Sequence, residues 1–269
     1  MGCYGSRKYE QGGLKHQPGR IQLIGLNMML LYGALAVYLG GLIQGLTGFG
    51  FSMVTVPLLV IFISPKMVVP AVLILSLVVN MVLFLKLREW VDLRRIRSLI
   101  IFGIAGMPVG VFLLVVLDAG LLKILIGSVI LLFAIAFLMG LRREIQNEQY
   151  GFAAVGVVSG LLNGSIKMAG PPVILFLTNQ GLAKQPFRAS LVSYFLFVNL
   201  ATVPVFCLGG VMTVSVARYA ILLIPVLIAG VLTGNQLARV VAEERFRVIA
   251  LIIVVAAALL SILSGVGLI

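Results

Sequence analysis

The sequence predicts an all-α polytopic membrane protein with almost no soluble domain. Hydrophobic residues make up 61% of the chain, and the mean hydropathy is +1.20. Soluble domains contain nearer 45–50% apolar residues, so much of this chain has to face something other than water. Only 10% of the residues are charged, and they cluster between long uncharged stretches. Several stretches exceed the roughly 18 to 20 apolar residues that cross a bilayer.

About eight hydrophobic segments are expected, in two sets of four. Short charged or turn-prone connections separate them, and no linker or low-complexity region divides the chain. The predicted segments are residues 28–63, 67–87, 96–117, 121–141, 152–178, 187–208, 216–238 and 246–269.

The first segment, 28–63, is too long for one upright helix. A helix of this length would measure roughly 54 Å, against about 30 Å of hydrocarbon. Its middle reads GLTGFG at 45–50, and Pro57 follows. Glycines weaken a helix, and proline removes a backbone donor. We therefore expect a broken or re-entrant helix, with its irregular backbone buried in protein or lining a wet cavity.

The same pattern returns in the fifth segment, which predicts two tandem repeats. Residues 159–172 read SGLLNGSIKMAGPP and again lead from a Gly-rich polar turn to proline. Asn80 has a counterpart in Asn199, and the glycine pair 106/110 is echoed by the pair 230/234. The expected divisions are a basic cytoplasmic tail at 1–25, a first transmembrane repeat at 26–145 and a second at 146–269. Parallel and inverted repeats both stay open, because the sense depends on whether each first segment crosses or re-enters.

The positions of lysine and arginine favour a cytoplasmic N-terminus. The tail carries four basic residues, and the connection 86–97 carries five more on the same side if every segment crosses once. Cytoplasmic loops are enriched in such residues. The assignment changes for the second half if both Gly-rich segments re-enter.

Paired Gly/Pro-interrupted segments at matching places in two halves point to a binding site of the kind found in transporters. A broken helix leaves free N–H groups and the positive end of its dipole, both of which attract an anion. For the glycine pairs 106/110 and 230/234 we prefer a role in close helix packing. The candidate substrate-binding residues are Gln44, Thr47, Gly48, Gly50, Ser52, Asn80, Asn163, Gly164, Ser165, Lys167 and Asn199.

Lys167 interrupts an otherwise uncharged stretch from Gly151 to Lys184. A cation at the centre of a membrane helix costs roughly 2.5 to 3.5 kcal/mol even on a mild scale, and a bound anion would offset that cost. In the other interpretation Lys167 lies nearer the interface and extends its ammonium to the headgroups.

Several classes of function find no support in the sequence. The chain has a single histidine, His16, so neither a Ser/His/Asp set nor a histidine metal site is expected, and no Walker-type phosphate loop occurs. No enzyme activity, metal or cofactor is expected. The net charge of +12 is spread over short connections beside apolar segments, which argues against nucleic acid. The expected partners are a small anionic substrate, the lipid bilayer and, as an open alternative, a second copy in a homodimer.

The chain resembles the TauE/SafE sulfite exporter family. The resemblance is carried by residues 41–59, from Gly41 through GLTGFG to Pro57, by their echo at 159–172, and by the basic connection followed by GMPVG at 106–110. The second repeat departs from the family pattern, since SIKMA at 165–169 stands where a Gly-rich stretch is usual. The resemblance implies a secondary transporter in the plasma membrane that carries sulfite, an organosulfonate or a related sulfur-containing anion. The alternative is a passive channel or a membrane scaffold that transports nothing.

Overall fold

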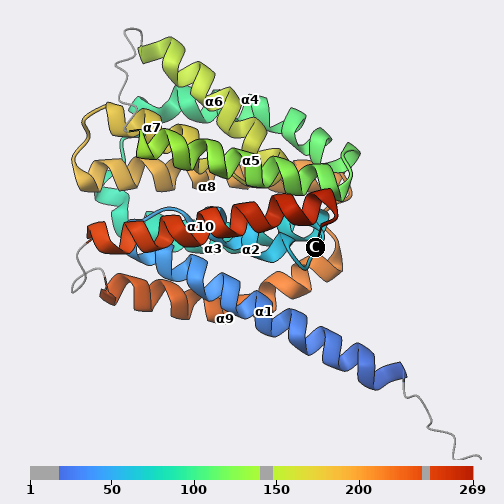
Figure 1. The fold of residues 1–269 in the computed structure, drawn as a ribbon. Helices are drawn as coiled ribbons and strands as arrows, with labels where there is room; N and C mark the ends of the chain where they lie inside the picture. Colours follow the sequence, from blue (N-terminus) through green and yellow to red (C-terminus); the bar gives the residue numbers. More distant parts are fainter. Residues whose placement is uncertain (1–17, 140–147, 238–242, 269) are drawn as a thin grey trace, which may run out of the picture.

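The computed structural model describes residues 18–139, 148–237 and 243–268, and within these ranges the regular structure is helical throughout (Figure 1). The predicted tail, including His16, lies largely outside the described residues, although the first helix already begins inside it. The helices are α1 (Pro18–Thr47), α2 (Phe51–Val60), α3 (Pro65–Leu87), the 3-10 turn η1 (Arg88–Trp90), α4 (Leu93–Val116), α5 (Ala119–Leu138), α6 (Glu148–Ile166), α7 (Gly170–Asn179), α8 (Lys184–Leu208), α9 (Val214–Leu237) and α10 (Glu243–Val266).

Six of the described helices are long and apolar enough to cross a membrane, which confirms the predicted all-α polytopic class. They are Met28–Thr47, Pro65–Trp90, Leu93–Val116, Ala119–Ala136, Lys184–Leu208 and Val214–Leu237. Large apolar side chains are exposed on their outer faces, for example Phe112 at 63% and Leu132 at 62%. Such surfaces are stable against lipid tails and costly in water.

The two predicted interruptions are present. The helix α1 ends at Thr47 and α2 begins at Phe51, and the intervening Gly48 and Gly50 have positive φ angles of 87° and 99°. Glycine adopts this left-handed conformation at little steric cost, which is why the turn forms here. In the second half, α6 ends at Ile166 and α7 begins at Gly170. The first and fifth predicted segments are therefore each two helices.

At the first interruption the chain reverses direction. The Tyr32 hydroxyl, midway along α1, donates to the carbonyl oxygen of Leu58, late in α2, at 2.9 Å. Gln44 near the end of α1 accepts a hydrogen bond at 2.9 Å from the N–H of Phe51 at the start of α2. The end of α1 thus meets the start of α2, and the middle of α1 meets the end of α2, so the two helices pack antiparallel. Residues 48–50 form the tip of this pair, here called tip 1.

The helices α6 and α7 pack in the same manner. The rings of Phe152, early in α6, and Phe176, late in α7, have centroids 4.7 Å apart. The Ser159 hydroxyl donates to the carbonyl oxygen of Ala169 at 2.7 Å and ties the two helices together near the turn. Residues 167–169 form the tip of this second pair, here called tip 2.

Glycines allow helices from the two halves to pack backbone against backbone. A Cβ atom on Gly106 would collide with the carbonyl oxygen of Val157 on α6, and one on Gly234 with that of Leu42 on α1. Gly110 and Gly230 make equivalent approaches to α6 and α1. The preferred packing role of these four glycines is confirmed. The sequence alone did not indicate that α4 pairs with α6 and α9 with α1.

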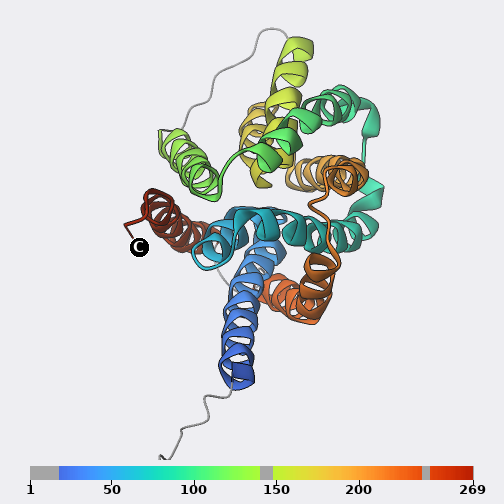
Figure 2. The same ribbon diagram turned by 90° about the vertical axis from the view of Figure 1, so that its right-hand side faces the viewer.

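The described turns gather at two ends of the bundle. In Figure 1 the α3–α4 and α7–α8 turns lie on the left, whereas the α4–α5 and α8–α9 turns lie on the right with the start of α1 and the end of α10. Figure 2 looks from that right-hand side and shows several helices nearly end-on. The left end, here called the basic end, carries Lys86, Arg88, Arg94, Arg95, Arg97, Lys184 and Arg188. The opposite end carries Lys66, Lys123 and Arg218.

The close approach of α9 to α1 predicts a steep cost for a side chain at Gly234. We expect Gly234→Leu to destabilise the protein by about 1–3 kcal/mol or more, because the added atoms overpack a backbone contact. The thermal midpoint in detergent should fall clearly below that of Ala229→Leu, a matched change at an exposed position of the same helix. Equal midpoints for the two variants would contradict this packing.

Candidate functional site

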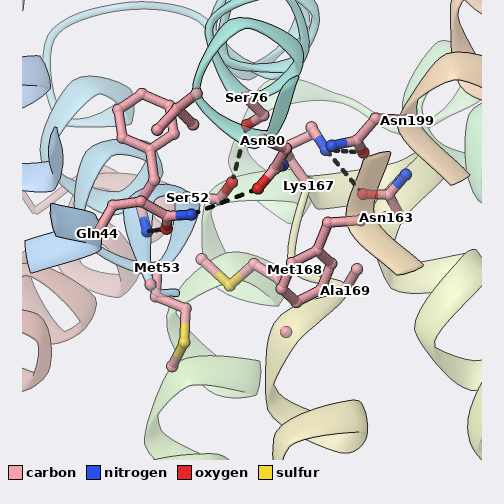
Figure 3. Close-up of a pocket in the computed structure, with 15 residues that line it drawn as sticks. Gln44, Ser52, Met53, Ser76, Asn80, Asn163, Lys167, Met168, Ala169 and Asn199 are labelled. Carbon is pink, nitrogen blue, oxygen red and sulfur yellow. Dashed lines mark hydrogen bonds between the residues drawn. The ribbon is translucent and has the colours of Figure 1, made fainter. Parts of the chain in front are cut away.

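Tip 1 and tip 2 meet around a pocket in the interior of the bundle (Figure 3). Polar side chains gather on one side of this pocket in the figure, and Met53 and Met168 lie on the other. The polar lining residues come from five helices and tip 2: Gln44, Ser52, Ser76, Asn80, Asn163, Lys167 and Asn199. The remaining lining residues are Gly50, Phe51, Met53, Val79, Met168, Ala169, Gly170 and Phe195.

Lys167 is buried in this pocket, with only 3% of its surface exposed. Its ammonium donates to the amide oxygen Oδ1 of Asn163 at 2.8 Å and to Oδ1 of Asn199 at 2.5 Å. The interpretation in which Lys167 reaches the headgroups does not match this position. Lys167 is also the one non-glycine residue with a positive φ angle, 62°, among the described residues. Such a conformation is strained for lysine and persists where the surrounding contacts determine it.

The two asparagines that hold Lys167 have fixed orientations. Both hydrogen bonds run from Nζ to an amide oxygen, so each asparagine presents its oxygen to Lys167. The amide nitrogen of Asn163 then points away and donates to the Thr202 hydroxyl at 3.1 Å, and that hydroxyl donates to the Val198 carbonyl at 2.7 Å. The amide nitrogen of Asn199 has no hydrogen-bond partner among the described residues, although it belongs to a lining residue.

Gln44 organises the polar contacts at tip 1. Its amide nitrogen donates to the carbonyl oxygen of Gly48 and to Oδ1 of Asn80, both at 3.4 Å. Its amide oxygen accepts from the N–H of Phe51, the first residue of α2. The side chain therefore bridges the interruption from one helix to the next. Asn80, like Asn199, turns its oxygen toward a donor from the neighbouring hairpin.

The N-terminus of α2 supplies further donors. Its N-cap residue is Gly50, which provides no side-chain cap. The first hydrogen bond within α2 runs from the Val54 N–H to the carbonyl oxygen of its N-cap residue, Gly50. The N–H groups of Ser52 and Met53 precede it and therefore have no acceptor within their own helix. The Ser52 hydroxyl lies 3.4 Å from that of Ser76 on α3. In α7 the equivalent N–H groups are missing, because Pro171 and Pro172 follow Gly170.

A chain of hydrogen bonds from α8 through α6 holds the backbone of tip 2 in place. The Tyr194 hydroxyl on α8 donates to the Ser159 hydroxyl at 2.8 Å, which in turn donates to the Ala169 carbonyl. Both side chains are fully buried. Tyr194 and Ser159 do not line the pocket, but through the Ala169 carbonyl they fix the backbone of tip 2, to which Lys167 belongs.

The structure brings together most of the predicted site residues. Those that line the pocket are Gln44, Gly50, Ser52, Asn80, Asn163, Lys167 and Asn199. The other four do not line it: Thr47, Gly48, Gly164 and Ser165.

These four residues make local contacts. The Thr47 hydroxyl bonds to the carbonyl oxygens of Ile43 and Phe49, and the Ser165 hydroxyl to that of Leu161. Gly164 packs against the α4 backbone at Met107. Gly48 leaves room for the side chain of Arg188, which a Cβ atom would meet.

Ser76 is the polar lining residue that was missing from the predicted set. It lies four residues before Asn80 on α3, and residues with this spacing share one face of a helix. Its spacing from Asn80 was the one feature of the sequence that could have assigned Ser76 to the site. The apolar lining residues carry no comparable mark, because Met53, Val79 and Phe195 look like any other apolar residue of a span. Within the described ranges, no group of three or more His, Cys, Asp or Glu side chains suitable for a metal ion occurs.

Known proteins match this chain over most of its length. The family model described as "Sulfite exporter TauE/SafE" matches residues 33–261. A protein of Cupriavidus necator named "Probable sulfite/organosulfonate exporter TauE" is 28% identical over 223 residues, which cover 80% of this chain and 84% of that protein. No solved structure matches.

The family match spans most of the chain and includes both tips and every residue that lines the pocket. Together with six helices able to cross a membrane, it defines a multi-pass protein of the bacterial inner membrane. The chain belongs to the TauE/SafE sulfite exporter family.

Proposed function

We propose that this protein is a secondary transporter that moves a small anion, sulfite or an organosulfonate, through the pocket between tip 1 and tip 2. The observation that carries the proposal is the buried Lys167 side chain, whose Nζ donates to two neutral amide oxygens. A buried cation is stable when an opposite charge neutralises it. An anionic substrate in the pocket would supply that charge. The "exporter" in the relative's name supports transport of this substrate class.

The donors around the pocket suit an oxyanion with several oxygen atoms. Nζ of Lys167 has three N–H bonds, and two of them are directed at Asn163 and Asn199, which leaves one for the substrate. The amide nitrogens of Asn80 and Asn199 face away from Gln44 and Lys167, so they can donate into the pocket. Ser52 adds a hydroxyl and a backbone N–H at the positive end of the α2 dipole.

The arrangement of helices supports two inverted repeats. Helices α1–α5 and α6–α10 follow each other in the same order, each set starting with an antiparallel pair. Gln44 and Asn163, Gly48 and Lys167, and Asn80 and Asn199 are all separated by the same interval along the chain. If each antiparallel pair enters and leaves on one side, α1 does not cross although its length would allow it. Three helices of each half then cross the membrane, α3–α5 in the first half and α8–α10 in the second. An odd number of crossings inverts the second repeat, and rocking of such repeats around a midplane site gives alternating access.

Re-entry also changes the expected orientation. The cytoplasmic N-terminus assumed that every segment crosses, whereas α1 and α2 return to the same end. Of the described lysines and arginines named above, the basic end carries seven and the opposite end three. Cytoplasmic loops are the ones enriched in these residues. We therefore place the basic end in the cytoplasm and the start of α1 on the outer side.

Replacement of Lys167 tests the proposed function. Lys167→Met should still insert and fold, because an apolar side chain is tolerated within the membrane, but it removes a charged hydrogen bond to the anion. Such bonds are worth about 1.5–3 kcal/mol, so exchange of labelled for unlabelled sulfite in proteoliposomes should fall by about 10- to 100-fold. In addition, sulfite should raise the thermal midpoint of the wild-type protein and not that of the variant.

The matched control is Lys123→Met. Lys123 donates to the Ser264 hydroxyl at 2.8 Å on α10, at the end of the bundle opposite the basic end, and does not line the pocket. Its replacement should leave exchange close to the wild-type rate. Near-normal exchange by a folded Lys167→Met protein would overturn the binding role. The absence of exchange in the wild-type protein would favour a passive channel or a scaffold.

Labelling of single cysteines tests the orientation. In a background without Cys3 and Cys207, Thr213→Cys in the α8–α9 turn should react with a membrane-impermeant thiol reagent in intact cells. Gln185→Cys at the basic end should react only after the membrane is permeabilised. Both positions are exposed. Labelling of Gln185→Cys but not Thr213→Cys in intact cells would indicate a cytoplasmic N-terminus instead.

A further inference from the structure

The groups that face Lys167 are all neutral. This inference rests on the proposed function and concerns what travels with the anion. Each helix that contributes polar atoms around Nζ contributes an amide or a hydroxyl: Asn163 on α6, Asn199 on α8, Asn80 and Ser76 on α3, Gln44 on α1 and Ser52 on α2. None of these side chains titrates near neutral pH.

None of the described residues that line the pocket is acidic. Glu89, Asp92 and Asp118 are exposed and lie in or beside turns. No carboxylate on these elements is therefore available to compensate an ammonium at position 167. Under the proposed function, the bound anion supplies the negative charge that compensates a protonated Lys167.

The hydrogen-bond count around Nζ distinguishes two states of the lysine. Two acceptors contact Nζ, the amide oxygens of Asn163 and Asn199. A neutral amine has two N–H bonds and one lone pair, so these two oxygens satisfy its donors completely. An ammonium has a third N–H bond, and its acceptor has to come from the pocket. The protein alone therefore supplies an acceptor for every N–H bond of the neutral amine. The ammonium has an acceptor for every N–H bond only when an anion is also bound.

We propose that Lys167 carries a proton across the membrane together with each anion. The lysine is an ammonium while the anion is bound. When the anion leaves, Nζ gives its proton to water or to the departing anion, and its N–H bond breaks with the electron pair kept on nitrogen. The empty carrier returns with a neutral amine, and Nζ takes up a proton from water as the next anion binds.

The residue type at this position fits that cycle. Lysine can lose its proton when it is buried, whereas arginine stays charged in proteins. A carrier with a permanent cation at position 167 would have to bring an uncompensated charge through the low-dielectric interior when it returns empty. Exchange of one bound anion for another requires no such empty return. A residue at position 167 that cannot release its proton should therefore impair net transport more than exchange.

The first test uses the wild-type protein in proteoliposomes at zero membrane potential. The probe is labelled methanesulfonate, which carries no proton of its own at neutral pH, and an outside pH one unit below the lumen is imposed. One-to-one coupling predicts accumulation of about tenfold over the outside concentration, since one pH unit corresponds to a tenfold ratio. Accumulation that does not change when the pH gradient is removed would overturn the proposal, and protein-free liposomes give the background.

The second test separates net uptake from exchange in Lys167→Arg, with labelled sulfite as the probe. We expect this variant to retain part of the sulfite exchange and to lose net uptake at least about tenfold more strongly, because its empty form cannot shed the charge. An unchanged ratio of net uptake to exchange would contradict proton carriage by Lys167. Loss of exchange for both anions in the wild-type protein would instead refute the proposed transporter, so the two failures are distinguishable.

Discussion

The amino group of Lys167, held by the carboxamide oxygens of Asn163 and Asn199 in the interior of a membrane protein, constrains the rest of the structure. A charge at this depth needs a preorganised polar surround, which an unbroken helix cannot provide. The interruption between α6 and α7 provides it, and the Tyr194–Ser159–Ala169 hydrogen bonds hold that interruption in shape. The glycine contacts between α4 and α6 then position the antiparallel pair α6 and α7.

The two tips solve the same backbone problem with different chemistry. Gly48 and Lys167 both take a positive φ angle at the end of the first helix of their pair, but only glycine does so without strain. Tip 1 offers backbone N–H groups at the start of α2, whereas prolines remove them from α7 and the lysine stands in as donor. The pocket is therefore asymmetric, with dipoles from one half and a full charge from the other.

The sequence predicted the fold class, both interruptions and most of the polar lining. Glycine and proline act locally, so their effect on a helix can be recognised without tertiary structure. Thr47 and Ser165 were assigned to the site because they flank the breaks, but a hydroxyl that bonds to its own helix cannot be told from one that faces a ligand by spacing alone. The antiparallel packing of α1 and α2, and with it the grouping of the basic turns, depends on contacts such as Tyr32 with Leu58 that no local pattern encodes.

The central claim, that an anion binds directly to Lys167 between the two tips, is tested most directly by locating the anion. Selenite has the shape and charge of sulfite, and selenium gives an anomalous diffraction signal. Diffraction from crystals soaked with selenite should give a peak with oxygen density within hydrogen-bond distance of Lys167 Nζ and beside the Asn199 amide nitrogen. A selenium peak elsewhere in the bundle, with the pocket unchanged, would contradict the account.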